Sequence, residues 1–293
     1  MGQAEPATQM TTIRGTDAID LHMHTTYSDG HWQPTALFAQ LAREGFRVVA
    51  VTDHDQVRHL AGTQALGISH GIVVVPGTEM TTVWHGMNAH VLCYAPVGVG
   101  FTSEALADLA RSTEDAQLAN TRAVHEELLR RGYTFPRQDD ILRAQGGQVA
   151  RPIDNARLIH ESGYAPTPAD ALAVITDAGY ISIKAPIAEA VAAAHASGAV
   201  TIMAHPGRGE GEIQRYDPPL LRELLADIPL DGLEVYYPTY TPKQIAAYAA
   251  LAAERDLLVS AGSDSHGPRQ RYPIRYPAER CAALLKRLRV RVE

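Results

Sequence analysis

Residues 46–55 read FRVVAVTDHD, an apolar run that ends in an imidazole between two carboxylates. The apolar part, 46–52, predicts a strand buried on both faces, as in the parallel sheets of α/β proteins. A polar cluster directly after such a strand is poorly explained as core. Asp55 is also placed to cap a following helix, but His54 between Asp53 and Asp55 has the pattern of a metal ligand with supporting carboxylates. The stretch therefore predicts a strand of an α/β fold with a functional group at its end.

Short apolar runs alternate with helical patterns toward both ends of the chain. Further strands are predicted at 18–23, 72–75, 89–95, 199–204, 233–236 and 257–261, and helices at 34–44, 186–197, 218–227 and 242–255. Buried strands that alternate with helices indicate parallel βαβ units in an α/β sheet or barrel. We predict this fold class.

The middle of the chain lacks that alternation. From about 103 to 179 the sequence predicts helices alone, including 104–131 and 168–178. Because the strand pattern resumes afterwards, a helical insertion into one α/β body fits better than two consecutive domains. The predicted parts are an N-terminal extension (1–16), a first α/β part (17–100), the insertion (101–182) and a second α/β part (183–293).

Side chains of metal-ligand type recur near the ends of the predicted strands. His22 and His24 are two residues apart on one strand, so both imidazoles point to the same side and can reach one cation. Asp264 and His266 repeat this spacing after the last strand. The full set of candidates is His22, His24, Asp29, His54, Glu79, His90, His205, Asp264 and His266. Singly each has an ordinary interpretation, such as a turn for Asp29; as a set near strand ends they predict a site.

The chemistry of these nine candidates indicates which cations they suit. We place Glu79 at the carboxyl end of the third strand and His90 at the start of the fourth. Nitrogen and oxygen ligands without a thiolate suit Mn²⁺, Fe²⁺ or Zn²⁺. Nine ligands are too many for one ion of ordinary coordination, so we predict two or three divalent metal ions.

The composition excludes several classes of protein. With 293 residues, 45% hydrophobic and 20% charged, the chain is neither disordered nor fibrous. No apolar run approaches the ~20 residues of a membrane span, 1–16 has no signal-peptide pattern, and two cysteines cannot form a disulfide framework. A formal charge of −7 argues against a broad electrostatic surface for nucleic acid. We expect a cytoplasmic protein without a membrane or an evident protein partner.

The ordered motifs resemble the PHP family, named for polymerase and histidinol phosphatase. The resemblance covers both α/β parts and runs through DLHMHTTYSDG, VVAVTDHD, VPGTE, AHVLCY, MAHPGR and AGSDSH. It implies a distorted seven-stranded β/α barrel with a helical insertion. It also implies one metal held by His22, His24, Glu79 and Asp264, a second shared through Glu79 with His90 and His205, and a third held by Asp29, His54 and His266. The family's spacing favours His90 over His85 as the ligand.

Within the family, the chain resembles the small members that act as nucleoside 3′,5′-bisphosphate phosphatases and 5′→3′ exoribonucleases. Those members carry an Arg-Pro-His segment in the insertion, whereas here Arg151 and Pro152 are followed by Ile153. A guanidinium matches phosphate oxygens in a bidentate fork. We therefore predict that Arg151 and Arg208 bind the phosphate of the substrate; a surface salt bridge is the alternative for each.

The predicted activity is metal-dependent hydrolysis of a phosphate monoester by a metal-activated bridging water. The predicted substrate is a small phosphorylated molecule: a nucleotide, such as a nucleoside 3′,5′-bisphosphate, or a short 5′-phosphorylated single-stranded RNA. His22, His24, Glu79 and Asp264 are the predicted catalytic set, and Asp53 and Asp55 are predicted to orient ligand imidazoles. Three alternatives remain open: a histidinol-phosphate phosphatase, a metal-dependent amidohydrolase and a non-catalytic metal-binding PHP module.

The remaining histidines lie outside the motifs. We predict surface or helix-face positions without chemistry for His31, His59, His70, His125, His160 and His195.

Overall fold

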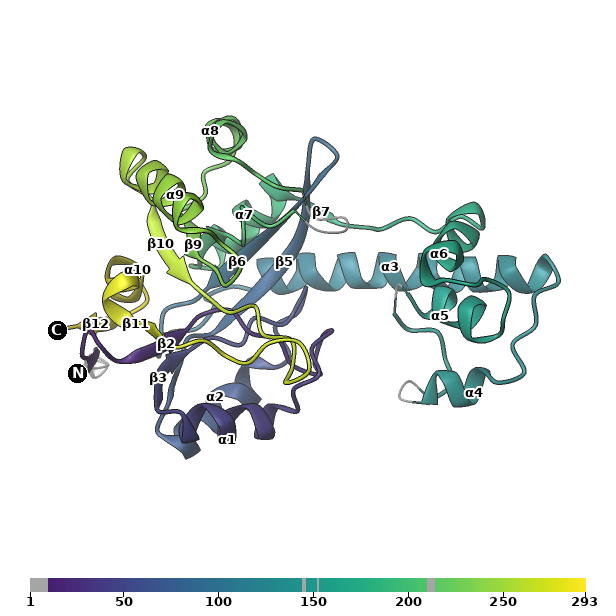
Figure 1. Cartoon of the computed structure of the whole chain (residues 1–293), viewed down its shortest axis with the longest axis horizontal. Coiled ribbons are helices and arrows are strands. Elements are labelled where there is room, and N and C mark those ends of the chain that lie inside the picture. Colours follow the sequence, from purple (N-terminus) through teal and green to yellow (C-terminus); the bar gives the residue numbers. More distant parts are fainter. Residues whose placement is uncertain (1–9, 144–145, 152, 210–213) are drawn as a thin grey trace, which may run out of the picture. The chain divides into compact units, whose positions relative to one another are not determined.

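The computed structural model describes residues 10–143, 146–151, 153–209 and 214–293, and the chain divides into two compact units. The first unit combines residues 1–110 with 185–293, and the second comprises 111–184. Figure 1 shows the strands gathered in the first unit and helices in the second. The ranges predicted for the extension, the two α/β parts and the insertion stay a prediction.

The strands of the first unit form three sheets among the described residues. The six-stranded sheet has the order β10 (Leu258–Ala261), β9 (Gly232–Tyr236), β8 (Val200–Met203), β6 (Met87–Tyr94), β5 (Gly77–Trp84) and β7 (Ala185–Pro186). The four-stranded sheet has the order β11 (Tyr276–Pro277), β2 (Ala18–Asp20), β3 (Phe46–Val49) and β4 (Val73–Val74). A separate pair joins β1 (Thr11–Ile13) and β12 (Val290–Val292). The α/β class is confirmed, while no closed seven-stranded barrel is defined in the described part of the chain.

Backbone hydrogen bonds also connect the two larger sheets just beyond their strands. The N–H of Leu21 donates to the carbonyl of Ala261 at 3.1 Å, and the N–H of Asp264 donates to the carbonyl of His22 at 2.8 Å. On the other side, the N–H of Glu79 donates to the carbonyl of Thr52 at 3.1 Å. The segments that follow β2, β3 and β10 therefore lie beside one another and beside β5.

Helices cover the strands of the first unit, and their ends follow local sequence signals. They are α1 (Pro34–Arg43), α2 (Leu60–His70), α7 (Ile187–Ala196), α8 (Pro218–Asp227), α9 (Pro242–Glu254), the short 3₁₀ helix η2 (Ala278–Cys281) and α10 (Ala282–Arg287). Thr241 and Gln244 form a capping box at the start of α9, which satisfies backbone donors that the helix itself leaves unpaired. Apolar side chains such as Leu21, Val48 and Ile202 are fully buried in the core between strands and helices.

The second unit has its own apolar core. Its helices are most of α3 (Ala105–Arg130), with α4 (Gln138–Ile141), α5 (Asp154–Glu161) and α6 (Pro168–Asp177). Leu128, Leu158 and Ile175 are fully buried among them. The helices predicted at 104–131 and 168–178 correspond to α3 and α6.

The β5–β6 hairpin differs from the sequence prediction. Glu79 lies inside β5 instead of ending a strand, and His90 lies inside β6 instead of opening one. β6 runs antiparallel to both β5 and β8, so the site is not built from parallel strands alone. The hairpin turns at His85 and Gly86, with φ of 49° and 78°, the two positive values that a type I′ turn requires. Gly86 readily adopts such a conformation, so the chain reverses in a tight turn. The two strands therefore extend into the region between the strands predicted at 72–75 and 89–95.

None of the described helices combines the length and the apolar character needed to cross a bilayer.

Candidate metal centre

All nine candidate ligands converge in the first unit. They come from segments after β2, β3, β8 and β10, from the turn that carries Asp29, and from the interiors of β5 and β6. The bridge between His54 and Glu79 and the bridge between Met23 and Ser265 hold these segments together. The ligands therefore depend on contacts between residues far apart in sequence.

Four buried side chains form what we call the inner cluster: His22, His24, Glu79 and Asp264. One donor atom from each lies within 4.8 Å of the others. Oε2 of Glu79 is 2.9 Å from Nε2 of His22 and 3.0 Å from Nε2 of His24. Oδ1 of Asp264 is 3.3 Å from Nε2 of His24. Two imidazoles and two carboxylates thus face a common centre.

The second oxygen of Glu79 faces two other imidazoles. Its Oε1 is 3.0 Å from Nδ1 of His90 and 3.0 Å from Nε2 of His205. Donor atoms of His54, Glu79 and His90 form a second group that could hold a cation. Glu79 therefore presents one oxygen to each of two neighbouring groups, an arrangement in which a carboxylate can bridge two cations.

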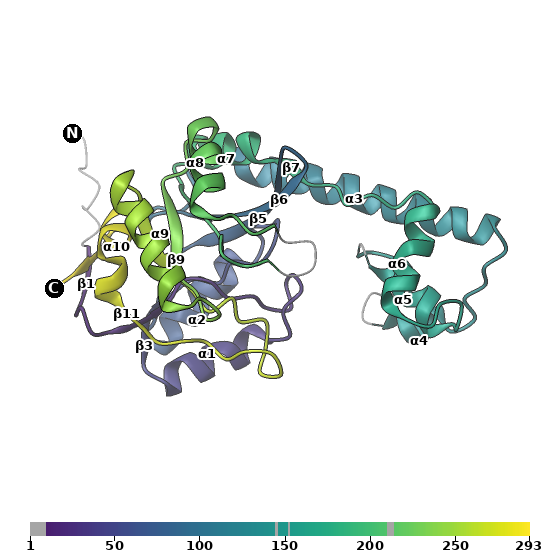
Figure 2. The same cartoon turned by 45° about the horizontal axis from the view of Figure 1, so that its top comes forward.

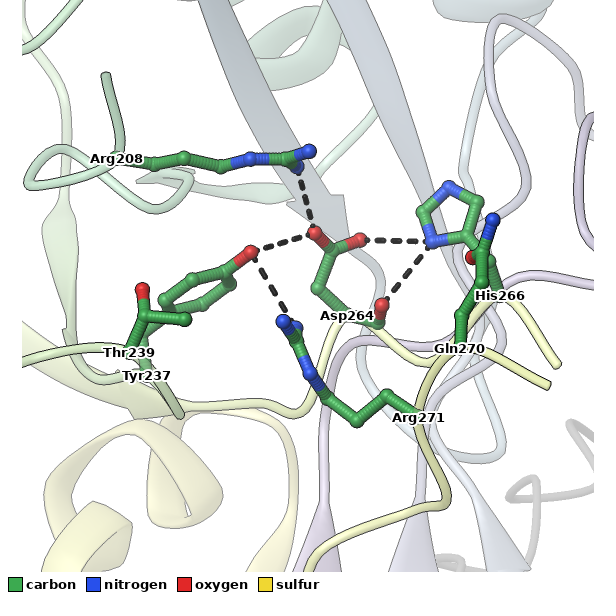
Figure 3. Close-up of a pocket in the computed structure, with 7 residues that line it drawn as sticks. All are labelled: Arg208, Tyr237, Thr239, Asp264, His266, Gln270 and Arg271. Carbon is green, nitrogen blue, oxygen red and sulfur yellow. Dashed lines mark hydrogen bonds and ion pairs between the residues drawn. The ribbon is translucent and has the colours of Figure 1, made fainter. Parts of the chain in front are cut away.

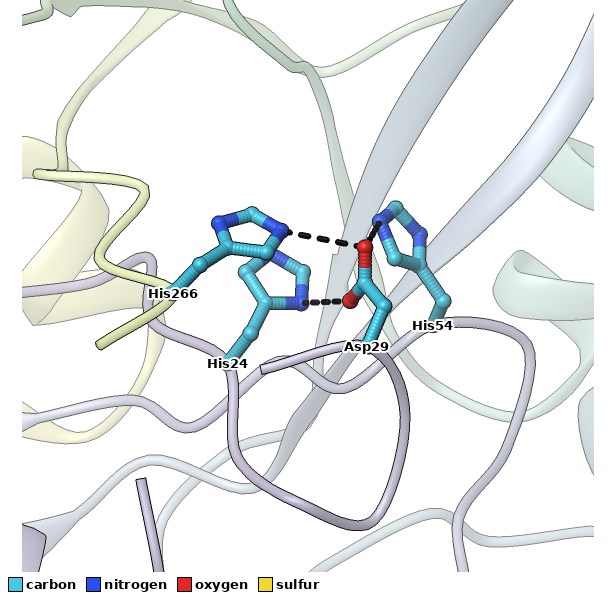
Figure 4. Close-up of side chains that lie close together, drawn as sticks. All are labelled: His24, Asp29, His54 and His266. Carbon is cyan, nitrogen blue, oxygen red and sulfur yellow. Dashed lines mark ion pairs between the residues drawn. The ribbon is translucent and has the colours of Figure 1, made fainter. Parts of the chain in front are cut away.

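A third group, the outer cluster, lies at the exposed edge and comprises His24, Asp29, His54 and His266. Figure 4 shows the three imidazoles directed toward the Asp29 carboxylate. Oδ2 of Asp29 is 3.2 Å from Nε2 of His266 and 4.0 Å from Nε2 of His54. His24 takes part in both clusters, because its Nδ1 is 3.7 Å from Oδ1 of Asp29.

Burial and opposite charges act against each other on the ionisation of these groups. Burial alone would lower the pKa of His24, but hydrogen bonds to Asp264 and Glu79 raise this pKa to about 10. The pKa of Glu79 is held well below its usual range by the imidazoles around it, of which His22 contributes most, despite the opposing effect of burial. For His54, burial prevails and lowers the pKa to about 4. Without a cation, the inner cluster therefore holds protons between its ligands.

The donor set fits divalent cations. Nδ1 of His24 is buried without a hydrogen-bond partner in the described structure, and Nε2 of His22 lies 3.1 Å from Nε2 of His24. Converging imidazole nitrogens and carboxylate oxygens are a normal environment for Mn²⁺, Fe²⁺ or Zn²⁺. Cys93 and Cys281 are buried outside the clusters, and burial raises the pKa of both thiols, so neither supplies a thiolate.

Sequence reasoning missed Glu234, a fully buried carboxylate in β9. Its Oε1 lies 3.0 Å from Nδ1 of His22, and its Oε2 accepts the backbone N–H of His205 at 2.7 Å. A carboxylate on the far nitrogen of a ligand imidazole fixes the orientation of the ring and its tautomer. The available signal was a single acidic residue inside the apolar run of residues 232–236, GLEVY.

The carboxylates of Asp53 and Asp55 bind groups of the neighbouring loops and of β5. Asp53 accepts hydrogen bonds from the backbone N–H and hydroxyl of Thr25 and from the hydroxyl of Ser28, at 2.7 to 2.8 Å. Asp55 accepts the backbone N–H of Thr81 at 2.7 Å. Both carboxylates thus hold segments that carry ligands, and their predicted role in orienting ligand imidazoles stays a prediction.

Asp264 is contacted by Arg208, which the sequence predicts as a binding residue, and by Tyr237, which the sequence did not single out. Oδ2 of Asp264 accepts hydrogen bonds from Nη1 of Arg208 at 2.9 Å and from the hydroxyl of Tyr237 at 2.8 Å. Arg271 in turn lies against Tyr237, 3.4 Å from its hydroxyl (Figure 3). Arg208 therefore lies beside the inner cluster, where a phosphate-binding residue is needed. Tyr237 contacts the same carboxylate, and Arg271 contacts Tyr237.

Arg151 belongs to the second unit. Its backbone N–H donates to the carboxylate of Asp154 at 2.8 Å, in the turn that leads into α5. The following Pro152 lies outside the described residues. The role of Arg151 in binding substrate stays a prediction.

Histidines outside the motifs differ in their surroundings. His85 is exposed at the tip of the β5–β6 hairpin. His90, in contrast, lies beside Glu79, with its Nδ1 3.0 Å from Oε1. His59 precedes α2 and is fully buried, so it does not lie at the surface, one of the two kinds of position predicted for it. Its Nε2–H donates to the carbonyls of Val51 and Gly77 at 3.0 and 3.1 Å, and this imidazole therefore connects the ends of two strand segments.

Comparison with known proteins gives a consistent result. The PHP domain model matches residues 20–160. The 5′-3′ exoribonuclease Rnm of Salmonella typhimurium is 31% identical over 259 residues, which is 85% of either chain. The phosphoribosyl 1,2-cyclic phosphate 1,2-diphosphodiesterase of Eggerthella lenta is 29% identical over 277 residues, and the alignment covers 88% of this chain and 99% of that protein. The 3′,5′-nucleoside bisphosphate phosphatase of Chromobacterium violaceum is 28% identical, with 85% of this chain and 87% of that protein aligned.

A solved structure supports the same assignment. A metal-dependent phosphoesterase from Bifidobacterium adolescentis superposes with a TM-score of 0.72 at 27% identity, covering 97% of this chain and 98% of the other. The structure contains three groups of side chains that could hold a metal ion, and the relatives named above match most of the chain. This chain therefore belongs to the PHP family of metal-dependent phosphoesterase hydrolases.

Proposed function

We propose that this protein hydrolyses a phosphate monoester of a nucleotide. The observation that carries the proposal is the placement of Glu79, whose two oxygens face two separate sets of imidazoles while Arg208 lies beside the inner cluster. The preferred substrates are a nucleoside 3′,5′-bisphosphate and a short 5′-phosphorylated oligonucleotide. The nucleotide class is supported by relatives named as an exoribonuclease and a nucleoside bisphosphate phosphatase.

We propose two or three divalent cations, Mn²⁺, Fe²⁺ or Zn²⁺, as cofactors. The inner cluster would hold one; Glu79, His90 and His205 would hold the second; and Asp29, His54 and His266 the third. When bound, such cations lower the pKa of coordinated water and neutralise charge on phosphoryl oxygens.

The chain's own groups have separate tasks. Arg208 binds and orients the phosphate through its guanidinium fork. Glu234 keeps the His22 imidazole turned toward the centre, and Asp53 keeps the loop that carries Asp29 in place. The buried inner side chains exclude bulk water from the centre, which strengthens every charge interaction there.

We propose that the strands close into a distorted seven-stranded barrel, with β4 and β5 as one continuous strand. The hydrogen bonds between the segments after β2 and β10 support closure on one side. The bond from Glu79 to Thr52 supports it on the other. Closure would place all ligand-bearing segments at one rim.

The first experiment measures phosphate release by the Mn²⁺-loaded protein. The substrates are adenosine 3′,5′-bisphosphate, histidinol phosphate and a short 5′-phosphorylated RNA. Clear preference for the nucleotide or the RNA is the expected result. Preference for histidinol phosphate would replace the substrate class, and no release from any of the three, with metal bound, would contradict the proposed function.

A second experiment tests the two arginines. Arg151→Ala is expected to raise KM about tenfold with little change in kcat, because one charge-assisted hydrogen bond to the phosphate is lost. Full activity of the double variant Arg151→Ala with Arg208→Ala would show that phosphate binds elsewhere.

A further inference from the structure

A cavity of about 80 Å³ lies beside Asp264, and its walls are rich in hydrogen-bond donors. The side chains that line it are Arg208, Tyr237, Thr239, Asp264, His266, Gln270 and Arg271 (Figure 3). Among them, only Asp264 is an acid, whereas two are arginines. The hydroxyl, amide and imidazole groups that complete the lining can all donate hydrogen bonds. This chemistry suits an anionic group.

The two oxygens of Asp264 face different surroundings. Oδ1 faces the inner cluster, 3.3 Å from Nε2 of His24. Oδ2 faces the cavity, where it accepts hydrogen bonds from Arg208 and Tyr237. The cavity is therefore separated from the centre of the inner cluster by the width of one carboxylate, and an anion bound there is distinct from one held at that centre.

Arg271 has donors left for a ligand. Its Nη1 donates to the carbonyl of Ser263 at 2.6 Å and lies 3.4 Å from the hydroxyl of Tyr237. Its Nε and Nη2 make no hydrogen bond to any described residue, and within that part of the chain no carboxylate pairs with it. In Figure 3, Arg208 and Arg271 approach the Tyr237 hydroxyl from opposite sides. The side chains that line the cavity thus include two guanidinium groups and one carboxylate.

We propose that this cavity binds a second anionic group of the substrate, a phosphate other than the one hydrolysed, and that Arg271 selects for it. The inference rests on the proposed phosphoesterase function. It makes a molecule with two phosphates, or an oligonucleotide with a phosphate next to the scissile one, the preferred substrate class.

The test compares adenosine 3′,5′-bisphosphate with adenosine 3′-monophosphate and adenosine 5′-monophosphate, using phosphate release by the Mn²⁺-loaded protein. The wild-type protein is expected to prefer the bisphosphate. Arg271→Met is expected to lower kcat/KM for the bisphosphate about 10- to 100-fold, and for the monophosphates less than about threefold, because it removes charge-assisted hydrogen bonds to one phosphate only. Arg269→Met is the matched control, since Arg269 is exposed on the same loop but does not line the cavity.

Two kinetic outcomes would overturn the proposal. An equal loss for bisphosphate and monophosphates would mean that Arg271 acts on the hydrolysed phosphate or on the fold. No loss for any substrate would mean that the cavity does not bind the second phosphate. Because Arg271→Met also removes the bond to Ser263, Gln270→Glu provides a second variant on an exposed side chain. Its added negative charge is expected to reduce the preference for the bisphosphate about tenfold, and an unchanged preference would contradict the proposal.

A binding measurement separates this inference from the proposed function. Calorimetric titration of the metal-free protein with inorganic phosphate is expected to show binding that Arg271→Met weakens about tenfold. Equal binding by both proteins would overturn the assignment of the cavity. If the wild-type protein releases phosphate from none of the three nucleotides, the proposed function fails, yet this titration still decides whether the cavity binds phosphate.

Discussion

The inner and outer clusters share His24 but differ in burial. All four side chains of the inner cluster are buried, whereas Asp29 in the outer cluster is 58% exposed. Their supports differ as well. His22 is held by the buried Glu234 carboxylate at 3.0 Å, whereas Nδ1 of His54 is supported by the neutral hydroxyl of Thr81 at 3.3 Å. A rigid, water-excluded site retains a cation better than an exposed one, so the inner cluster is expected to bind its metal tightly and the outer cluster to exchange it.

Removing an inner ligand is expected to have the largest effect. His22→Ala or Asp264→Ala should lower turnover at least about 1000-fold, because the centre loses a ligand and with it the activation of water. Phosphate release and metal content by mass spectrometry measure this, with circular dichroism to confirm the fold. His85→Ala, on an exposed histidine outside the clusters, is the matched control. Unchanged turnover in either inner variant would refute the assignment of the inner cluster.

Loosening an inner ligand without removing it is expected to have the next largest effect. Glu234→Gln keeps the size of the side chain but removes the charge beside Nδ1 of His22. Metal affinity should fall about 10- to 100-fold, measured by competition with a chelator. Glu223→Gln, on the exposed face of α8, should leave affinity unchanged. If both variants bind metal like the wild-type protein, Glu234 does not orient His22.

The sequence was most informative where a local signal coincides with function. Apolar runs that end in polar residues predicted β3, β8 and β10 and the ligands that follow them. Such strands can be predicted because the apolar residues of the buried strand and the polar residues at its end are neighbours in the sequence. The i, i+2 spacing likewise predicted that His22 and His24 serve one centre, as the inner cluster now places them.

Features that depend on contacts between distant segments could not be predicted in the same way. Glu234 resembles any acidic residue in a strand until the fold brings it to His22, 212 residues earlier. Arg271 and Tyr237 stand 34 residues apart and carry no motif. The β5–β6 hairpin was missed because its turn has His85 before Gly86, where the usual signal is Asn, Asp or Gly before glycine.

The two clusters are expected to respond differently to pH. Hydrogen bonds to Asp264 and Glu79 outweigh burial and raise the pKa of His24 to about 10. At pH 7 the metal-free inner cluster therefore holds a proton that the cation must displace. Its apparent affinity should rise about tenfold per pH unit between pH 6 and 8 for each proton displaced. Burial lowers the pKa of His54 to about 4, so this ligand has no proton to lose between pH 6 and 8. A cation added to the outer cluster after the inner one is filled should therefore bind with a shallower pH dependence than the first. Equal slopes for both binding steps would contradict this difference.

Breaking the outer cluster is expected to cost less than breaking the inner one. Asp29→Asn removes the carboxylate that the three outer imidazoles face. It should release the third cation and lower kcat about tenfold, while two equivalents of metal stay bound, because the inner ligands do not depend on Asp29. Metal stoichiometry after dialysis separates the outcomes. Loss of all bound metal would show that the two clusters fill as one unit.

The smallest effect is expected from the support of the outer cluster. Thr81→Val removes the hydroxyl near Nδ1 of His54 and keeps the shape of the side chain, while Thr81→Ser keeps the hydroxyl and serves as the control. A single neutral hydrogen bond contributes about 0.5 to 1.5 kcal/mol, so affinity for the third cation should fall about 2- to 10-fold in the valine variant alone. The contrast with Glu234→Gln then measures how much a buried carboxylate adds over a hydroxyl in holding a ligand imidazole. A larger loss from Thr81→Val than from Glu234→Gln would reverse the proposed ranking of the two clusters.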